Sequence, residues 1–438
     1  MRPALLFLAL FVPFSYFNHS DGWNQGVRLA ELHAVVLKGT LRIDDYISYT
    51  GDRALIDGHY YSEKAPAMAL LALPSFAATV GVQKMMGIDP DSPAATRWSE
   101  WIATACSVGL LAAIGGVAFF ALIEFKFGTL VAVIATFALF LGSFTFPYAT
   151  ALFAHAGTIG LIAIALWGTL GPPSSRRDTI AGLAAGFAVA SEYPAVLVGA
   201  PIGLYLAAKD VKRMWRFGLA TLPALALILV NNFAISGSPF KLSYGVNPNF
   251  PELTASTGFG FSLPDPRAMF AVMWGEYRGL WFWNPVLLMA ILGFVEMFRK
   301  DRASAIMTLA GCVLVLLQVG AFFMWFGGNA FGPRYLAPAL PLFGLATAYG
   351  IKRWPELGLI LTLASIVVML IVTAIAIDPP GDVLTPLRSF YVARIEQDRW
   401  APNLGTLIGL PLWLSLTVPL IVPAIVSWRL LKARRVAA

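Results

Sequence analysis

The chain has 438 residues, of which 58% are hydrophobic and 13% are charged, and its mean hydropathy is +0.72. Soluble domains are about 45–50% apolar and about 25% charged, so this composition argues against a soluble globular protein and indicates a chain folded in lipid. The net charge of +7 comes without a Lys/Arg block interleaved with aromatic residues, which argues against nucleic acid as a partner and favours basic cytoplasmic loops.

The chain is expected to form one transmembrane domain, 1–438, with no separate soluble C-terminal domain. The apolar run 1–17 lacks a cleavage site and is predicted to stay as the first span. Residues 18–99 then form an outer loop, and residues 100–438 carry the remaining spans and a second outer loop, 237–279. Since a span needs about 20 apolar residues, further spans are predicted over 100–124, 128–147, 151–170, 217–236, 280–298, 303–325, 334–350, 357–377 and 406–428.

The first outer loop begins with a predicted amphipathic surface helix. Apolar residues recur with a helical period from Val27 to Leu37, and Gly39 stands where a C-cap glycine belongs. Ser20 and Asp21 precede this helix. The Asp21 carboxylate is therefore either a helix N-cap or a functional group, and both interpretations stay open.

The rest of this loop combines an irregular stretch with a second helix. Asp44, Asp45 and Asp52 lie in the irregular stretch and are expected to be solvated. The apolar run 65–86 is long enough to cross a bilayer, but a crossing there would place Arg2 and the basic C-terminal tail on opposite sides. We therefore expect 65–86 to lie in the outer interface.

Two short apolar helices are predicted between 179 and 208, with Glu192 at the turn between them. One continuous helix would bury Glu192 in lipid and place Pro194 mid-helix, and both are costly. His155 stands near the start of an earlier predicted span. For Glu192 and His155 alike, a hydrogen-bonded structural role and a substrate role stay open.

Basic residues set the predicted orientation, because they concentrate in cytoplasmic loops. They gather on one side of the predicted bundle, together with both termini: Arg176, Arg177, Lys209, Lys212, Arg213, Arg216, Arg299, Lys300, Arg302, Lys352, Arg353, Arg429, Lys432, Arg434 and Arg435. The opposite loops carry most of the Asp and Glu. The N- and C-termini are therefore expected to be cytoplasmic, and the polar loops to face outward.

Seven ionisable residues reach the outer side: Asp21, Arg28, Glu63, Lys64, His155, Glu192 and Arg334. The sequence shows no zinc-ligand spacing and no phosphate-binding loop, so no cofactor is predicted and a divalent metal has no ligand motif to support it. An outward-facing membrane enzyme has no nucleotide supply and needs an activated lipid as donor. A lipid phosphate held by Lys64 and Arg334, with a carboxylate that deprotonates an acceptor hydroxyl, suffices for glycosyl transfer. The alternative for Arg334 is an interfacial turn with a snorkelling side chain.

Four stretches resemble the GT-C superfamily of polytopic glycosyltransferases, nearest to bacterial protein-O-mannosyltransferases and lipid A aminoarabinose transferases. They are Asp21 to Arg28, then Asp57-Gly-His-Tyr-Tyr-Ser-Glu63-Lys64-Ala-Pro66, then Glu192-Tyr193-Pro194 with its flanking helices, and Gly-Pro-Arg334-Tyr-Leu. The resemblance implies an all-α polytopic membrane protein of the bacterial cytoplasmic (inner) membrane. Its GT-C type helical bundle would have a periplasmic first loop that carries juxtamembrane helices.

The resemblance also implies a reaction, the inverting transfer of a hexosyl or pentosyl group from a polyprenyl-phosphate donor to a lipid, glycan or protein acceptor. It implies Asp21 as the general base, and Lys64, Arg334 and Arg28 as ligands of the donor phosphate. Further substrate-site candidates on the outer side are Glu63, His59, Tyr61, His155, Glu192 and Glu276. The chain departs from the family pattern at Gly22, where a second carboxylate is usual, and at Ala65, where a proline is usual.

A polytopic transporter or a lipid or sugar flippase is the alternative function. A transporter is expected to show two related halves with interrupted helices at matching positions. This chain has one interrupted hairpin without a matching partner, and its polar residues concentrate in one loop. These features favour the enzyme.

Overall fold

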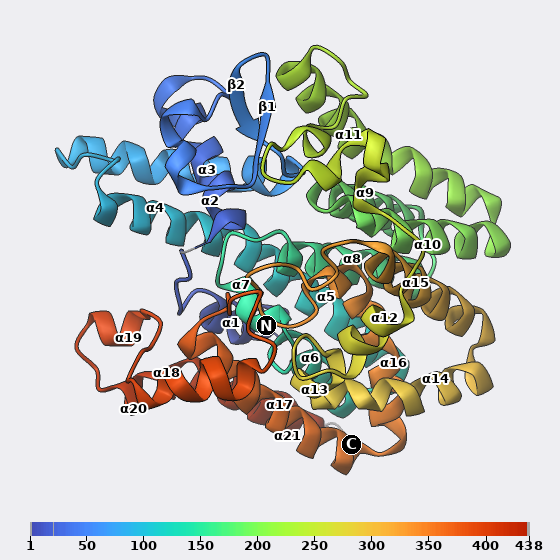
Figure 1. Cartoon of the computed structure of the whole chain (residues 1–438). Helices are drawn as coiled ribbons and strands as arrows, with labels where there is room; N and C mark the ends of the chain where they lie inside the picture. The colour runs from blue at the N-terminus through green and yellow to red at the C-terminus, as the bar shows by residue number, and fades with distance from the viewer. Residues whose placement is uncertain (1, 21, 436–438) are drawn as a thin grey trace.

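A computed structural model of the chain describes residues 2–20 and 22–435, and the protein is 74% helical and 3% strand. The first ten α-helices are α1 (Arg2–Phe14), α2 (Trp23–His33), α3 (Ala67–Met85), α4 (Pro93–Thr104), α5 (Leu110–Phe127), α6 (Thr129–Phe140), α7 (Thr145–Ala149), α8 (His155–Leu170), α9 (Ser175–Ser191) and α10 (Val196–Lys209). They are followed by α11 (Val211–Ser236), α12 (Pro266–Trp274), α13 (Leu280–Trp283), α14 (Met289–Lys300), α15 (Arg302–Ala321), α16 (Leu340–Arg353), α17 (Pro355–Ile375), α18 (Ala393–Glu396), α19 (Leu404–Leu407), α20 (Leu412–Ser415) and α21 (Val418–Arg435). The strands β1 (Arg53–Ile56) and β2 (His59–Ser62) form an antiparallel hairpin (Figure 1).

Six helical segments in the described part of the chain are long and apolar enough to cross a bilayer: 67–85, 93–127, 211–236, 302–321, 355–375 and 412–432. Shorter apolar helices, including α1, α6 and α8, complete the bundle. The protein is therefore a multi-pass membrane protein, as its composition predicts.

Every predicted span contains a helix, but several of them are interrupted, and three of the interruptions lie at prolines. Asn284-Pro285 separates α13 from α14 within 280–298. A 3-10 segment, Arg334–Ala339, precedes α16 within 334–350. Short helices and turns precede α21 within 406–428. Proline removes a backbone donor and clashes with the preceding turn, so these breaks follow from the sequence.

Small residues let the helices of the bundle approach closely. At the crossing of α5 and α8, a Cβ added to Gly115 would lie 2.3 Å from the Cα of Gly160. At the crossing of α14 and α16, a Cβ on Gly293 would lie 1.8 Å from the carbonyl oxygen of Ala346. The glycines therefore set the distances between these helix pairs.

Helices α9 and α10 meet at Glu192, as predicted. Glu192 has extended backbone angles, φ −148° and ψ 110°, and a 3-10 turn, Tyr193–Ala195, leads into α10. The break turns the Glu192 side chain away from a continuous helix. It also places the side chain beside the N-terminal end of α8.

Helix α3 packs on α4 and on the π-helical turn Ala105–Gly109 that joins α4 to α5. The segment 93–127 is one helix of 35 residues, about 52 Å long, so it exceeds the bilayer core of about 30 Å by about 20 Å. Helix α3 is itself long and apolar enough to cross a bilayer, so the location of 65–86 in the outer interface stays a prediction.

The structure of α2 differs from the predicted amphipathic surface helix. The helix runs through a π-helical turn, Ala34–Lys38, to Gly39, whose φ of 67° gives the expected left-handed C-cap. However, Gln25 to His33 are all buried, so α2 is not an amphipathic surface helix. The β-hairpin, α3 and the 3-10 segment Asp44–Tyr49 pack around it. The N-cap residue is Gly22, so no side chain at the N-cap position caps this helix.

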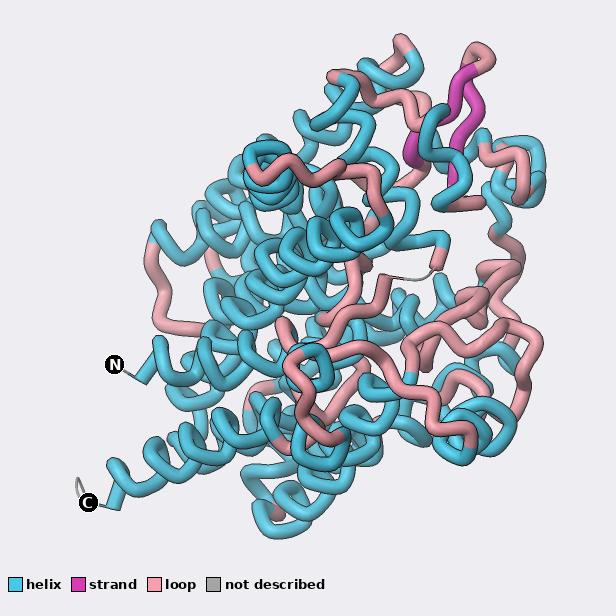
Figure 2. Tube along the Cα trace, turned by 90° about the vertical axis from the view of Figure 1, so that its left-hand side faces the viewer, coloured by secondary structure: helices cyan, strands magenta, loops and turns pink. Residues whose placement is uncertain are grey.

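The two ends of the chain lie at the same side of the molecule in Figure 2, and the β-hairpin lies at the opposite side. The predicted topology, with both termini cytoplasmic and the first loop outside, requires this separation.

Candidate active site

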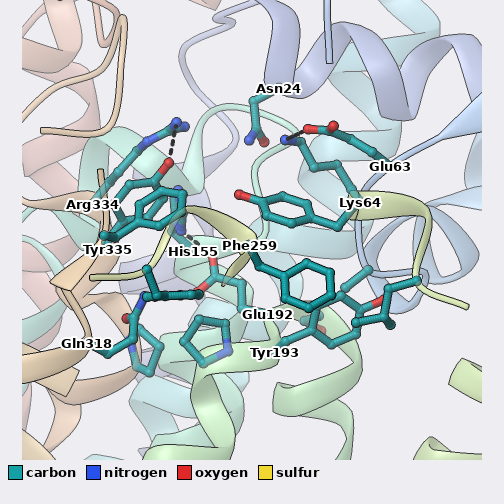
Figure 3. Close-up of a pocket in the computed structure, with 18 of the residues that line it drawn as sticks. Asn24, Glu63, Lys64, His155, Glu192, Tyr193, Phe259, Gln318, Arg334 and Tyr335 are labelled. Atoms are coloured by element: carbon teal, nitrogen blue, oxygen red, sulfur yellow. Dashed lines mark hydrogen bonds and ion pairs between the residues drawn. The ribbon is translucent and has the colours of Figure 1, made fainter. Parts of the chain in front are cut away.

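A cavity of about 350 Å³, called the first cavity, lies where the first outer loop meets the helical bundle (Figure 3). Its charged and imidazole side chains come from segments far apart in the sequence: Arg28, Glu63, Lys64, His155, Glu192 and Arg334. Apolar and aromatic side chains form much of the remaining wall: Leu242, Tyr244, Phe259, Phe261, Phe322 and Pro338. Six of the seven outer residues that the sequence grouped together therefore share one cavity.

The β-hairpin positions Glu63 and Lys64. Asp57-Gly58 is the turn, and both residues have positive φ, 50° and 82°, as a tight hairpin turn with Asp-Gly requires. The register pairs Arg53 with Ser62. The residues on either side of the hairpin are Asp52, before β1, and Glu63, after β2. The pairing consequently brings them close together.

Lys64 lies between two carboxylates. Its Nζ is 2.6 Å from Glu63 Oε1 and 2.9 Å from Asp52 Oδ2. Asp52 is 9% exposed, so the prediction that Asp52 is solvated is wrong. Because an ammonium has three N–H donors, one donor of Lys64 stays available to a ligand in the cavity.

Glu63 is held as an ordered part of the wall. Its side chain is 2% exposed, and its second oxygen accepts a hydrogen bond from Asn247 Nδ2. Burial raises the pKa of Glu63, and the adjacent Lys64 ammonium opposes that rise. Asn247 lies in the second outer loop, so this bond joins the two outer loops across the cavity.

Arg28 reaches the cavity from α2. Its Nη1 donates to Asn24 O at 2.8 Å and to Asn24 Oδ1 at 2.5 Å, and its Nε has no hydrogen-bond partner within the described chain. Burial lowers the pKa of Arg28 to about 10, which keeps the guanidinium charged at neutral pH. The nearby charge of Arg334 contributes to this lowering, so two like charges face one space.

Arg334 reaches the same cavity from the start of the 3-10 segment Arg334–Ala339. It is 9% exposed, its Nη2 donates to Tyr335 Oη at 3.3 Å, and its Nε has no hydrogen-bond partner among the residues described. It forms no ion pair within 4.0 Å with any carboxylate in 2–20 or 22–435. An anion in the cavity would satisfy this buried charge.

The loop before Arg334 is held by Arg278, which is fully buried. Arg278 donates from Nε to Phe326 O at 2.8 Å and from Nη2 to Gly328 O at 2.9 Å. Gly327 and Gly328 have positive φ, 78° and 64°, which favours glycine. The glycines and Arg278 together orient Arg334, a role that the sequence did not reveal.

His155 and Glu192 form a buried pair on the wall opposite α2. His155 Nδ1 contacts Glu192 Oε1, and the two side chains are 7% and 12% exposed. His155 is the first residue of α8, and the ring of Tyr148 packs against it edge-on at 5.0 Å. Glu192 lines the same cavity as the two arginines.

The other predicted site residues do not line the first cavity. His59 pairs with Asp44 at 2.8 Å near the tip of the hairpin. Tyr61 packs into a small cluster with Ile56, and the Glu276 carboxylate accepts the Leu387 N–H at 3.2 Å. Asp21, the predicted general base, lies outside the described residues.

The sequence did not predict three residues of the site: Tyr244 and Gln318, which line the cavity, and Asn247, which binds Glu63. They stand in a loop and inside an apolar helix, where no local pattern marks them. Asp52 had a usable signal, because the Asp57-Gly58 turn predicts a hairpin whose flanks bring Asp52 near Glu63. No three His, Cys, Asp or Glu side chains in 2–20 and 22–435 gather as a metal-binding group.

Glu31, on α2 near Arg28, makes the stability of the protein pH-dependent. Burial raises the pKa of its carboxyl from the ordinary 4.5 to about 7, although a bond from Ser62 and the charge of Arg28 oppose this. The folded state then holds more protons than the unfolded state between these values, so stability falls as the pH rises from about 4.5 to about 7.

Glu31→Gln is expected to remove this dependence. At pH 8 the variant should be more stable than the wild type by up to about 3 kcal/mol, and at pH 4.5 the two should be alike. Thermal unfolding midpoints at both pH values measure the effect, with the exposed Glu252→Gln as control. Parallel pH profiles for the wild type and Glu31→Gln would contradict the buried, protonated state.

The fold is that of GT-C glycosyltransferases. The oligosaccharyltransferase of Archaeoglobus fulgidus in its apo form superimposes with a TM-score of 0.50 at 13% identity, over 92% of this chain and 56% of that one. ArnT from Cupriavidus metallidurans bound to undecaprenyl phosphate gives 0.46 at 15% identity, over 84% and 62%. The chain thus spans about three fifths of the length of these structures. No family model and no curated protein sequence matches it.

Proposed function

We propose that this protein is a glycosyltransferase that moves a sugar from a polyprenyl-phosphate donor to a hydroxyl-bearing acceptor at the outer face of the membrane. The observation that carries the proposal is the composition of the first cavity. Arg28 and Arg334 face it as buried cations that no described carboxylate pairs within 4.0 Å, and Phe259, Phe261 and Phe322 line its apolar side. A lipid phosphate, anionic at one end and hydrocarbon at the other, matches this distribution.

The proposed reaction is an inverting displacement. The acceptor oxygen attacks the anomeric carbon, the bond from that carbon to the phosphate oxygen breaks, and the polyprenyl phosphate leaves with the electron pair. A carboxylate takes the acceptor proton, and we propose Asp21 for this role. Arg28 and Arg334 stabilise the charge that develops on the leaving phosphate.

The likeness to the archaeal structure supports this proposal through the fold alone. That protein is an oligosaccharyltransferase, so the same helical arrangement serves glycosyl transfer there. We also propose that the protein lies in a bacterial cytoplasmic membrane with both termini in the cytoplasm.

The test is a transfer assay with the purified full-length chain in lipid nanodiscs. A polyprenyl-phosphate sugar labelled in the sugar is added with a membrane extract as acceptor. We expect the label to move from the polyprenyl phosphate into a new covalent product. Movement of intact donor across the bilayer of proteoliposomes, without a new product, would instead support the flippase.

Lys64 needs a design that separates binding from folding. Lys64→Ala leaves Glu63 and Asp52 buried without their cation, and breaking a buried pair in this way costs about 3–5 kcal/mol. The triple variant Asp52→Asn, Glu63→Gln, Lys64→Met removes all three charges together. It is expected to fold near wild-type stability and to bind polyprenyl phosphate about tenfold more weakly, since one charge-assisted bond is lost.

Native mass spectrometry with polyprenyl phosphate measures the affinity, and thermal unfolding measures the stability. Wild-type affinity in the triple variant would remove Lys64 from the phosphate site and leave it as a partner of Glu63 and Asp52 only.

A further inference from the structure

A second cavity of about 330 Å³ is lined mainly by polar groups and shares no lining residue with the first. Its lining includes Asn18, His19 and Ser20 from the segment after α1, Arg97 from α4, and Arg394 from α18. Asp378 and Trp400, from the loops that follow α17, complete the polar part of the wall. Nothing in the proposed donor site uses these residues.

Two segments of the chain connect the two cavities. In the first segment, Ser20 lines the second cavity and Asn24 lines the first. In the second, Thr150 Oγ1 lies 2.8 Å from His19 Nδ1, and His155, five residues on, lines the first cavity. The segment 18–24 therefore contributes to the lining of both cavities, and Asp21 falls between Ser20 and Asn24 in the sequence.

The charges of the second cavity differ from those of the first. Two arginines and one aspartate line it within the described chain. Burial lowers the pKa of His19 to about 4, so its imidazole is neutral at pH 7 and adds no charge. The lining is consequently cationic by one charge, which attracts an anionic group.

The remaining lining suits a sugar. Asn18, Ser20 and His19 offer short polar side chains that bind hydroxyl groups. Trp400 presents an indole whose Nε1 is already bonded to Asp398 at 2.8 Å, which holds the ring in place. Large aromatic rings with nearby polar groups are common in small-molecule sites.

We infer that the second cavity is the acceptor site, and that it takes a hydroxyl-bearing sugar with a phosphate or carboxylate group, bound through Arg97 and Arg394. The acceptor hydroxyl would enter from the side of Ser20, and the donor sugar from the side of Asn24. The assignment of this cavity as an acceptor site rests on the proposed function. The anionic ligand itself can be tested without any transfer.

The first experiment measures binding to the full-length protein in nanodiscs, with glucose 6-phosphate and glucose as probes. We expect saturable binding of glucose 6-phosphate and at least tenfold weaker binding of glucose. Arg97→Gln combined with Arg394→Gln should weaken glucose 6-phosphate binding at least tenfold, whereas Arg388→Gln, an exposed arginine outside both cavities, should leave it unchanged. Equal binding of both probes, or equal binding by the double variant, overturns the inference.

The second experiment follows the label in the transfer assay. The product should bind to an anion-exchange resin, and extraction into an organic phase or retention in water then shows whether the anionic group belongs to a lipid headgroup or to a free glycan. The double variant should raise the KM for the acceptor at least tenfold and leave the KM for the donor unchanged. A neutral product overturns the inference of an anionic acceptor and leaves the proposed function standing. Absence of any product counts against the proposed function. In that case the binding experiment still tests whether the second cavity binds an anionic sugar.

Discussion

Arg334→Gln is expected to reduce kcat/KM for sugar transfer about 100-fold, because the donor phosphate and the charge that develops on it in the transition state lose one cation. Removing one preorganised donor from a developing anion costs about 10²–10³ in rate. Arg334 is buried, and no carboxylate in the described chain pairs with it. The neutral variant therefore leaves no charge orphaned, and the fold should survive.

The conservative variant Arg334→Lys sharpens this prediction. A lysine keeps the charge but loses the fork that binds two phosphate oxygens at once. Its activity should lie between that of the wild type and that of Arg334→Gln, while Arg388→Gln should match the wild type. Donor KM and kcat, measured separately for each variant, test this. If both are unchanged in Arg334→Gln, Arg334 is only a snorkelling residue.

Asp21→Asn is expected to lower turnover about 1,000-fold while polyprenyl-phosphate binding persists. A positioned general base contributes about 10²–10⁴ to a rate, and asparagine keeps the size of the side chain but cannot accept the acceptor proton. The residue lies outside the described part of the chain. The expectation therefore rests on the resemblance and on the position of Asp21 between Ser20 and Asn24, which line the two cavities.

A matched control for Asp21→Asn is Asp45→Asn. Asp45 lies in the same outer loop, its side chain is 68% exposed, and its one ion pair within 2–20 and 22–435 is with the half-exposed Lys38. Single-turnover kinetics at saturating donor separate the chemical step from binding. If Asp21→Asn keeps wild-type turnover, Asp21 is a structural residue at the start of α2, and another group must take the proton.

Much of the fold follows from the sequence because lipid imposes strong constraints on a chain. Apolar length predicted the helices of the bundle, and the cost of burying Glu192 and Pro194 in one helix predicted the break between α9 and α10. The interruption at Asn284-Pro285 was not expected, although proline is a known signal for it. Helix α2 looked like a surface helix because its own sequence is amphipathic, and only the later hairpin and α3 bury it.

The site was predictable only in part. Arg28, Glu63, Lys64, His155, Glu192 and Arg334 could be grouped because all were assigned to the outer side, where charged residues are few. Their pairing could not be predicted. Asp52 neutralises Lys64, and Asn247 orders Glu63. The Asp52 contact forms within the first outer loop when the β-hairpin closes. The Asn247 contact depends on how the two outer loops meet, and no local pattern in either loop encodes that meeting.

The most direct test of the account is an electron cryomicroscopy map of the full-length protein in nanodiscs with added undecaprenyl phosphate. We expect the phosphate in the first cavity, within hydrogen-bond distance of Arg28 and Arg334, with the hydrocarbon chain along Phe259, Phe261 and Phe322. A phosphate bound elsewhere, including between Arg97 and Arg394, would contradict the assignment of the first cavity to the donor.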